Sequence, residues 1–124
     1  MNFDRTEDQK MLAEQARKLL EDASSPDRLR ELIDSKADFD QPLWQQLGEL
    51  GFLGAAISEA YGGIGMTSME LATIAEELGR ANAAIPFISS IVLAAKAIEL
   101  AGSEAQKNLW LPLIASGEII ACYG

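Results

Sequence analysis

Three glycines within four positions, residues 62–65 (Gly-Gly-Ile-Gly), form the first group in this sequence whose type and spacing point to chemistry. Glycine adopts positive φ angles and lets another molecule come close to the backbone, so a run of this kind can cradle a phosphate group. The run lacks the Gly-Lys-Ser/Thr of a P-loop, and Ser68 stands where a dinucleotide fingerprint has its last glycine. A turn that packs the domain is therefore the preferred interpretation, and a cofactor cradle is the alternative.

Two neighbouring carboxylates, Glu76 and Glu77, form the second group. A pair of carboxyl groups can act as general acid and general base when the two side chains meet at one reacting bond. Consecutive residues of a helix do not face each other, however. We therefore expect both side chains on the outer side of a helix, either solvated or in salt bridges between domains.

The chain has one cysteine, Cys122, and no histidine. This composition excludes an internal disulfide and removes the commonest metal ligand and general base at neutral pH. Zinc sites and nucleophilic centres of the Ser/His or Cys/His type are therefore not expected. Because Cys122 has no basic neighbour that would activate it, the sequence predicts a buried structural thiol.

The charge balance limits the partners of the chain. Ten basic and nineteen acidic residues give a net charge of −9, which repels phosphate backbones and anionic lipid surfaces. Residues 1–5 do not begin a signal peptide, and no later apolar run reaches the length of a bilayer span. The sequence thus predicts a cytoplasmic protein that binds neither nucleic acid nor membrane.

Helix signals position these groups. Capping boxes predict three helix starts, at Thr6–Gln9, Thr67–Glu70 and Ser103–Gln106, and Ser25-Pro26 and Pro42 mark two more. Residues 87–101 are apolar on nearly every side, which is typical of a helix surrounded by protein or facing an apolar ligand. Together these signals predict an all-α bundle of about six helices.

Four shorter segments carry more specific expectations. Leu43, Leu47 and Leu50 are spaced as one buried helical stripe. Residues 52–57 are apolar and interrupted by glycine, which favours an extended segment through the core. Pro112 should kink or restart the last helix. Residues 119–123 are β-prone and indicate the start of a β-strand.

In its order of motifs the chain resembles the N-terminal all-helical domain of the FAD-dependent acyl-CoA dehydrogenase family. The resemblance begins with Phe3 and the acidic first helix, and it covers essentially the whole chain. The other matching pieces are Trp44–Phe52 (WQQLGELGF), Glu59–Met66 (EAYGGIGM), Ala75–Arg80 (AEELGR), Ala101–Lys107 (AGSEAQK) and Trp110–Glu118 (WLPLIASGE).

The resemblance implies the domain plan and the reaction of the complete enzyme. Residues 1–118 would be the N-terminal helical domain and residues 119–124 the start of a missing β-domain. Later segments would carry most FAD contacts and the glutamate base, so neither cofactor-binding nor catalytic residues are assigned here. The complete enzyme would dehydrogenate an acyl-CoA thioester, a reaction of lipid metabolism, by hydride transfer to FAD. The chain alone would not.

The resemblance also implies that the helix after the fourth supplies one wall of the acyl-chain cavity. Counting back from Ala101 places the wall near Pro86, Ser89, Ser90 and Leu93. Ser89 and Ser90 are small where straight-chain enzymes often carry a longer polar residue, so the hypothesis is room for a branched or ring-bearing acyl group.

Two readings of the whole chain stay open. In the first, the chain works with the remaining domains or subunits of an acyl-CoA dehydrogenase, in a homo- or hetero-oligomer. In the second, it is a free-standing acidic helical module that docks a flavoprotein through its apolar C-terminal run.

Overall fold

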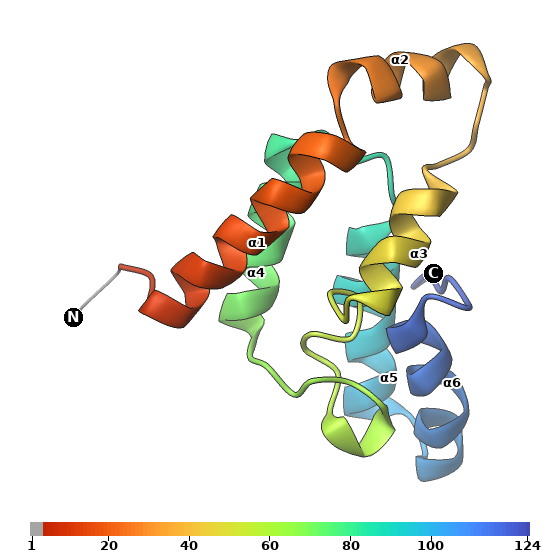
Figure 1. The fold of residues 1–124 in the computed structure, drawn as a ribbon. Coiled ribbons are helices and arrows are strands. Elements are labelled where there is room, and N and C mark those ends of the chain that lie inside the picture. Colours follow the sequence, from red (N-terminus) through yellow and green to blue (C-terminus); the bar gives the residue numbers. More distant parts are fainter. Residues whose placement is uncertain (1–3) are drawn as a thin grey trace.

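The computed structural model describes residues 4–124 (Figure 1). Phe3, the first residue of the family resemblance, lies outside the described residues. Residues 4–124 form helices, turns and irregular segments and contain no β-strand. The expected all-α class with about six helices is confirmed for this part of the chain.

The helices follow one another with short connections. The six α-helices are α1 (Glu7–Ala23), α2 (Pro26–Asp34), α3 (Gln41–Glu49), α4 (Ser68–Arg80), α5 (Lys96–Ala101) and α6 (Glu104–Ser116). A 3₁₀ turn, η1 (Glu59–Tyr61), lies before the glycine run, and a π-helical segment, η2 (Ile88–Ala95), leads directly into α5.

All three predicted capping boxes are present. Thr6, Thr67 and Ser103 each accept a backbone hydrogen bond from the helix that they start, and the side chain three residues on returns a bond to the cap backbone. The Ser25 side chain likewise caps α2, with Pro26 at its first position. These signals act within one helical turn, which is why sequence alone locates them.

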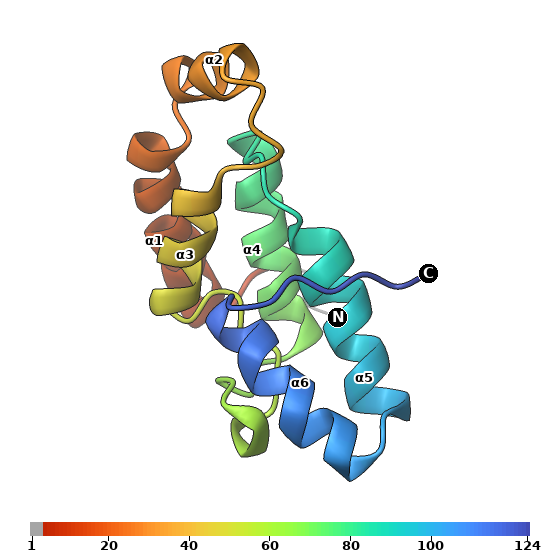
Figure 2. The ribbon, with the colours of Figure 1, turned by 90° about the vertical axis from the view of Figure 1, so that its right-hand side faces the viewer.

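The helices form two groups (Figures 1 and 2). α1 lies along α4, while α6 packs against η2, α5, α3 and η1. Trp44 connects α3 with the C-terminal end of α6, because its indole Nε1 donates a hydrogen bond to the carbonyl of Gly117 at 3.0 Å. The fully buried apolar side chains come from both groups and from the α3–α4 connection: Trp44, Leu47, Leu53, Ile74, Leu111 and Ile114.

Two expectations for the middle of the chain are wrong. Residues 52–57 thread the core as expected but form successive tight turns, in which Ala55 N–H donates to Phe52 and Ile57 N–H to Gly54. Leu50 is 57% exposed although its spacing places it on the stripe of Leu43 and Leu47. α3 ends at Glu49, so Leu50 leaves the helix before the stripe continues.

The end of the chain differs from expectation in three respects. α6 runs through Pro112 to Ser116 as one helix, so the helix is not restarted at Pro112. Residues 119–124 form no strand, and the N–H of Ala121 instead donates to the Ser90 hydroxyl at 3.2 Å. Cys122 is exposed, so the expected buried thiol is wrong, because the segment that carries it lies over the outside of the bundle (Figure 2).

None of the helices formed by residues 4–124 combines the length and the apolar character that a membrane span needs. The same residues contain no cluster of three or more acidic or thiol side chains arranged to hold a metal ion.

Replacing Gly79 with Ala is expected to stabilise the chain by about 0.5 kcal/mol, because glycine loses more conformational freedom in a helix than alanine does. Gly79 lies in α4, and a Cβ built there comes within 4 Å of no atom of residues 4–124 beyond the adjacent backbone of its own helix. Urea denaturation followed by far-UV circular dichroism measures the difference. A loss of stability would show that the open space beside Gly79 matters to the fold.

Candidate functional site

The helix of residues 87–101 carries the predicted site and is confirmed as one continuous helical stretch. Ile88–Ala95 is π-helical, and Lys96–Ala101 continues it as α5. π-Helical segments are rare, and many lie at functional sites. The sequence does not signal this conformation, because the apolar pattern of the segment has no sharp face that would distinguish one helical pitch from another.

The four predicted wall residues fall into different environments. Ser90 is fully buried, and its hydroxyl accepts the N–H of Ala121. Pro86 and Ser89 are half-buried and joined, because the Ser89 hydroxyl donates to the Pro86 carbonyl at 3.2 Å. Leu93 is 51% exposed. Ser89 and Leu93 are thus accessible on the helix, Pro86 is accessible just before it, and Ser90 is buried against the C-terminal segment.

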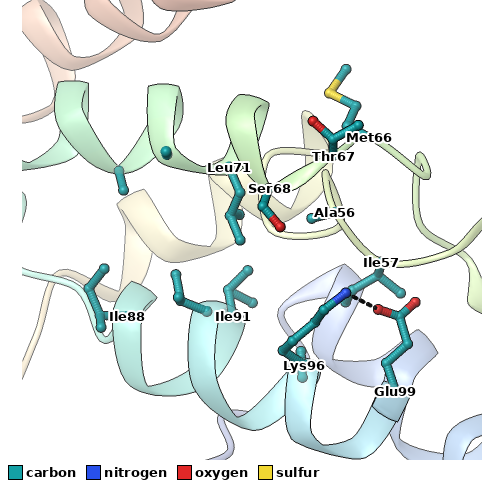
Figure 3. A pocket seen from close by; sticks show the side chains of 14 residues that line it. Ala56, Ile57, Met66, Thr67, Ser68, Leu71, Ile88, Ile91, Lys96 and Glu99 are labelled. Carbon is teal, nitrogen blue, oxygen red and sulfur yellow. Dashed lines mark hydrogen bonds and ion pairs between the residues drawn. The ribbon is translucent and has the colours of Figure 1, made fainter.

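A cavity of about 620 Å³ lies between α4 and the η2–α5 helix (Figure 3). None of the four predicted wall residues lines it. Its apolar lining includes Ile57 from the α3–α4 connection, Leu71 and Ala75 from α4, and Ile88, Ile91 and Val92 from the opposite helix. Segments distant in sequence thus enclose a mainly aliphatic space.

One end of this cavity is polar. Thr67 and Ser68 line it at the start of α4, and Lys96 and Glu99 line it from α5. The Lys96 ammonium is 3.3 Å from Glu99 Oε2, while Glu99 Oε1 accepts the Ser58 N–H at 3.1 Å. Both carboxylate oxygens of Glu99 are therefore already bonded.

The glycine run is fixed by its own backbone. The N–H groups of Gly62, Gly63, Ile64 and Gly65 donate to carbonyls of Glu59, Ser58, Gly54 and Ile57, at 2.8–3.2 Å. A phosphate cradle needs free N–H groups, and this run offers none. The cofactor-cradle alternative is therefore excluded, and the run is a packing turn.

Side chains from the later helices hold the same turn in place. Glu99 binds the Ser58 N–H, and Tyr61 donates its hydroxyl to Glu104 Oε2 at 2.8 Å. The hydrogen bond to the Glu104 carboxylate raises the pKa of the Tyr61 hydroxyl, because ionisation would break it and place two negative charges together. The turn is thus positioned by α5 and α6.

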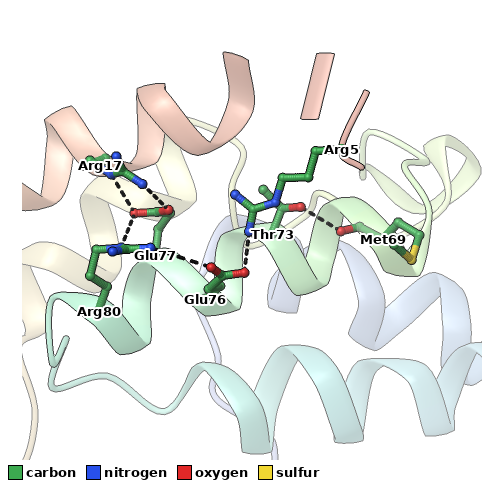
Figure 4. A network of polar contacts seen from close by, with 7 residues as sticks. All are labelled: Arg5, Arg17, Met69, Thr73, Glu76, Glu77 and Arg80. Carbon is green, nitrogen blue, oxygen red and sulfur yellow. Dashed lines mark hydrogen bonds and ion pairs between the residues drawn. The ribbon is translucent and has the colours of Figure 1, made fainter. Parts of the chain in front are cut away.

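The neighbouring carboxylates of α4 are not an acid/base pair (Figure 4). Glu77 is 1% exposed and receives two hydrogen bonds from the Arg17 guanidinium, at 2.9 and 3.1 Å, and a third contact from Arg80. Glu76 is exposed and pairs with Arg5 and Arg80. The expectation that Glu77 lies outside is wrong, because α1 covers that side of α4.

Sequence reasoning missed the cavity. Its residues come from the 56–57 and 66–75 stretches and from 88–99, and no local motif connects those stretches. The available signals were weak: small residues at Ala72 and Ala75, and an oppositely charged pair, Lys96 and Glu99, three positions apart. Either signal alone is common on helix surfaces.

The sequence matches the model of a known protein family. Residues 6–118 match the family model for the acyl-CoA dehydrogenase N-terminal domain. Acyl-CoA dehydrogenase FadE27 from Mycobacterium tuberculosis is 32% identical over 120 residues, which are 97% of this chain and 32% of that protein.

Solved structures agree with this match. A chain of the ChsE4-ChsE5 complex from Mycobacterium tuberculosis has a TM-score of 0.90 and 32% identity, and the match covers 97% of this chain and 33% of that one. An acyl-CoA dehydrogenase complexed with FAD from Bacillus anthracis has a TM-score of 0.84 and 35% identity, with coverages of 95% and 21%. The chain thus spans a third or less of each of these proteins.

Proposed function

The chain belongs to the acyl-CoA dehydrogenase family, as its N-terminal domain, and from this premise we propose that it forms part of the acyl-chain cavity of a complete dehydrogenase. The complete enzyme removes hydrogen from the α and β carbons of an acyl-CoA thioester. The chain contributes a wall for the substrate, with no reacting group of its own. It works in an assembly with the remaining domains or subunits.

FAD accepts the hydride in the proposed reaction, as the flavoprotein relatives imply. The glycine run of this chain does not fit the phosphates of FAD, because its N–H groups are bonded internally. We therefore place most of the flavin contacts on the remaining domains. The same proposal includes a β-domain that starts at residues 119–124.

The acyl-chain wall is proposed along Pro86, Ser89 and Leu93, with Ser90 behind them. The observation that supports it is the exposure of the aliphatic Leu93 side chain, one helical turn beyond the half-buried Ser89. In this proposal the exposed Leu93 side chain supplies apolar contact for the acyl chain, and the small side chain of Ser89 leaves room beside it. Such a surface suits an acyl chain and tolerates a branch or ring.

Replacing Ser89 with Leu in the complete enzyme is expected to shift preference toward shorter acyl chains. The larger side chain occupies space above Pro86, so kcat/KM for the longest accepted acyl-CoA should fall about tenfold relative to the shortest. Steady-state kinetics over a series of straight and branched acyl-CoA substrates measure this ratio. Ser90 is unsuitable for the same test, since a leucine at a fully buried position would disturb packing.

Ser35→Leu is the matched control, because it makes the same change at an exposed position just after α2. The control should leave the substrate ranking unchanged. If Ser89→Leu also leaves the ranking unchanged while the enzyme stays active, the wall does not lie along this part of the helix.

The second proposal is a free-standing helical module that docks a flavoprotein. It is favoured by the exposed apolar side chains of Ile120 and Tyr123 in the C-terminal segment. An absorbance spectrum of the purified chain, alone and after copurification with a partner, addresses both proposals. The chain alone should be colourless, and flavin bound to it without a partner would contradict both.

A further inference from the structure

We propose that Ser90 is a positioning residue: by holding Ala121 it fixes the direction in which the chain leaves the helical domain. Ala121 belongs to the C-terminal segment, residues 118–124, which follows α6. The role of Ser90 in the reaction rests on the function proposed above, whereas the anchoring of Ala121 concerns this chain alone. The two are therefore tested separately.

One hydrogen bond holds the outer part of the C-terminal segment. The N–H of Ala121 donates to the Ser90 hydroxyl at 3.2 Å, and the residues after Ile119 form no other hydrogen bond with the described part of the chain. Ile119 itself is held by its own N–H, which donates to the Leu113 carbonyl at 3.2 Å. Beyond Ile119, the hydrogen bonding that directs the chain thus comes from Ser90.

Side-chain packing fixes this part of the segment only loosely. Ile119 and Ala121 are half-buried against the bundle, whereas Ile120 and Tyr123 are exposed. A cavity of about 450 Å³ lies beside Ala121, between α5 and α6, and a methyl group cannot fill it. Figure 2 shows the segment crossing the η2–α5 helix and continuing past it to the C-terminus. The hydrogen bond to Ser90 is therefore the main constraint on where the segment crosses the helix.

Ser90 provides a rigid acceptor for this bond. Its side chain is fully buried in η2, and its backbone N–H donates to the Pro86 carbonyl at 3.1 Å. Because side chains in a close-packed interior have little room to change rotamer, the hydroxyl oxygen stays in one place. The half-buried N–H of Ala121 would lose free energy if it were left unpaired. The bond therefore holds the segment to one point of the helix.

The anchor and the proposed acyl-chain wall lie on the same short helix. Ser89 and Leu93 belong to the wall, and Ser90 between them holds the segment that leads toward the proposed β-domain. Since most flavin contacts are proposed on the remaining domains, the bond between Ser90 and Ala121 helps to set the distance from the acyl chain to the flavin. Misplacing reacting groups by 1 Å can cost about 100-fold in rate. Ser90 thus acts on the reaction through Ala121 and does not touch the reacting atoms.

Ser90→Ala removes the acceptor, and amide hydrogen exchange of the 124-residue chain, followed by NMR, tests the anchor. The Ala121 amide should exchange about three- to tenfold faster than in the parent, as expected for the loss of one hydrogen bond. A spin label on Cys122, which is exposed and the only cysteine, should become more mobile. Ser24→Ala is the matched control, because this buried serine also forms a long-range hydrogen bond, to the Ala81 carbonyl at 3.1 Å. Unchanged exchange of Ala121 in Ser90→Ala would overturn the proposal.

The complete enzyme tests the consequence for the reaction. In Ser90→Ala the rate at which an acyl-CoA reduces the flavin, measured by stopped-flow absorbance, should fall about three- to tenfold. KM and the ranking of acyl-CoA substrates should stay at the parent values, since Ser89 and Leu93 are unchanged, and Ser24→Ala should keep the parent rate.

Two results of these kinetics would contradict the positioning role. One is faster exchange of Ala121 with unchanged flavin reduction, and the other is a changed substrate ranking, which would place Ser90 in the wall itself. If no acyl-CoA reduces the flavin of the parent enzyme, the proposed function fails instead, and amide exchange still decides whether Ser90 holds Ala121.

Discussion

Replacing Arg17 with Met is expected to lower the free energy of unfolding by about 3 kcal/mol, because it leaves the Glu77 carboxylate buried without its main partner. Arg17 binds both oxygens of Glu77, at 2.9 and 3.1 Å, and Glu77 is 1% exposed. The Arg80 contact at 3.3 Å remains, which keeps the loss at the lower end of the range for broken buried pairs. Urea denaturation measures the loss.

Arg30→Met is the matched control. Arg30 pairs with Asp27 on the surface of α2, and both side chains are largely exposed, so its loss should change the free energy of unfolding by less than about 0.5 kcal/mol. Both variants change the net charge equally. The double variant Arg17→Met, Glu77→Leu should recover much of the loss, since it leaves no unpaired charge in the interior. Equal losses in Arg17→Met and Arg30→Met would show that the buried pair contributes nothing specific.

The loss should also depend on pH. The hydrogen bonds from Arg17 hold the pKa of Glu77 below its ordinary value of 4.5, against the effect of burial. A carboxyl group with a lowered pKa stabilises the fold above pH 4.5, and this contribution disappears as pH falls through the folded-state pKa. The difference between parent and Arg17→Met should therefore be full at neutral pH and shrink in acid.

Glu70 adds a second contribution in the same direction. Hydrogen bonds from the side chains of Thr67 and Gln9 lower its pKa to about 2. Gln9 belongs to α1 and Glu70 to α4, so this carboxylate also joins the two helices. The parent chain should thus lose stability progressively as pH falls from about 4.5 toward 2, with the α1–α4 contact weakened first.

Replacing Gly63 with Ala is expected to destabilise the fold by about 3 kcal/mol or to prevent folding. A Cβ at this position would lie 2.0 Å from the carbonyl oxygen of Ile57 and 2.5 Å from its carbonyl carbon. Backbone atoms cannot move aside as a flexible side chain does. The Ile57 carbonyl also accepts the N–H of Gly65 at 2.8 Å, so relieving the clash would break a hydrogen bond of the turn.

Gly65→Ala is the control for this variant. Gly65 has a positive φ of 75°, and a Cβ there would lie 3.4 Å from the Glu59 side chain, which is ordinary contact. Its cost should be only the backbone strain, about 1 kcal/mol. Thermal and urea unfolding of both variants give the comparison, and equal costs would show that close packing at Gly63 is not what requires glycine there.

The starts of the helices were predictable from sequence. Thr6, Thr67 and Ser103 each bond to a group no more than three residues away, so a short motif contains both partners. The same is true of Ser25, whose hydroxyl accepts the N–H of Arg28 at the start of α2. The order of motifs along the chain then identified the family, and with it the all-helical fold.

The site was predictable only in part. Sequence counting placed Pro86, Ser89, Ser90 and Leu93 at one helix. The structure has Ser89, Ser90 and Leu93 in η2 and Pro86 just before the helical stretch, but counting could not distinguish buried Ser90 from exposed Leu93. The difference in their exposure depends on the C-terminal segment. In that segment the N–H of Ala121, 31 residues after Ser90, donates a hydrogen bond to the Ser90 hydroxyl. The cavity behind this helix depends in the same way on α4.

The sequence by itself determined the helix starts and their caps, because the partners of these interactions lie within one helical turn. Its composition also excluded histidine chemistry and an internal disulfide. Only the tertiary structure decided that Glu77 is buried, that the amides of residues 62–65 are occupied, and that an aliphatic cavity opens beside Ser68. The physical reason is the same in each case. Whether a group is buried or hydrogen-bonded depends on groups from distant parts of the chain. The residue pattern of one segment does not show which other segments pack against it.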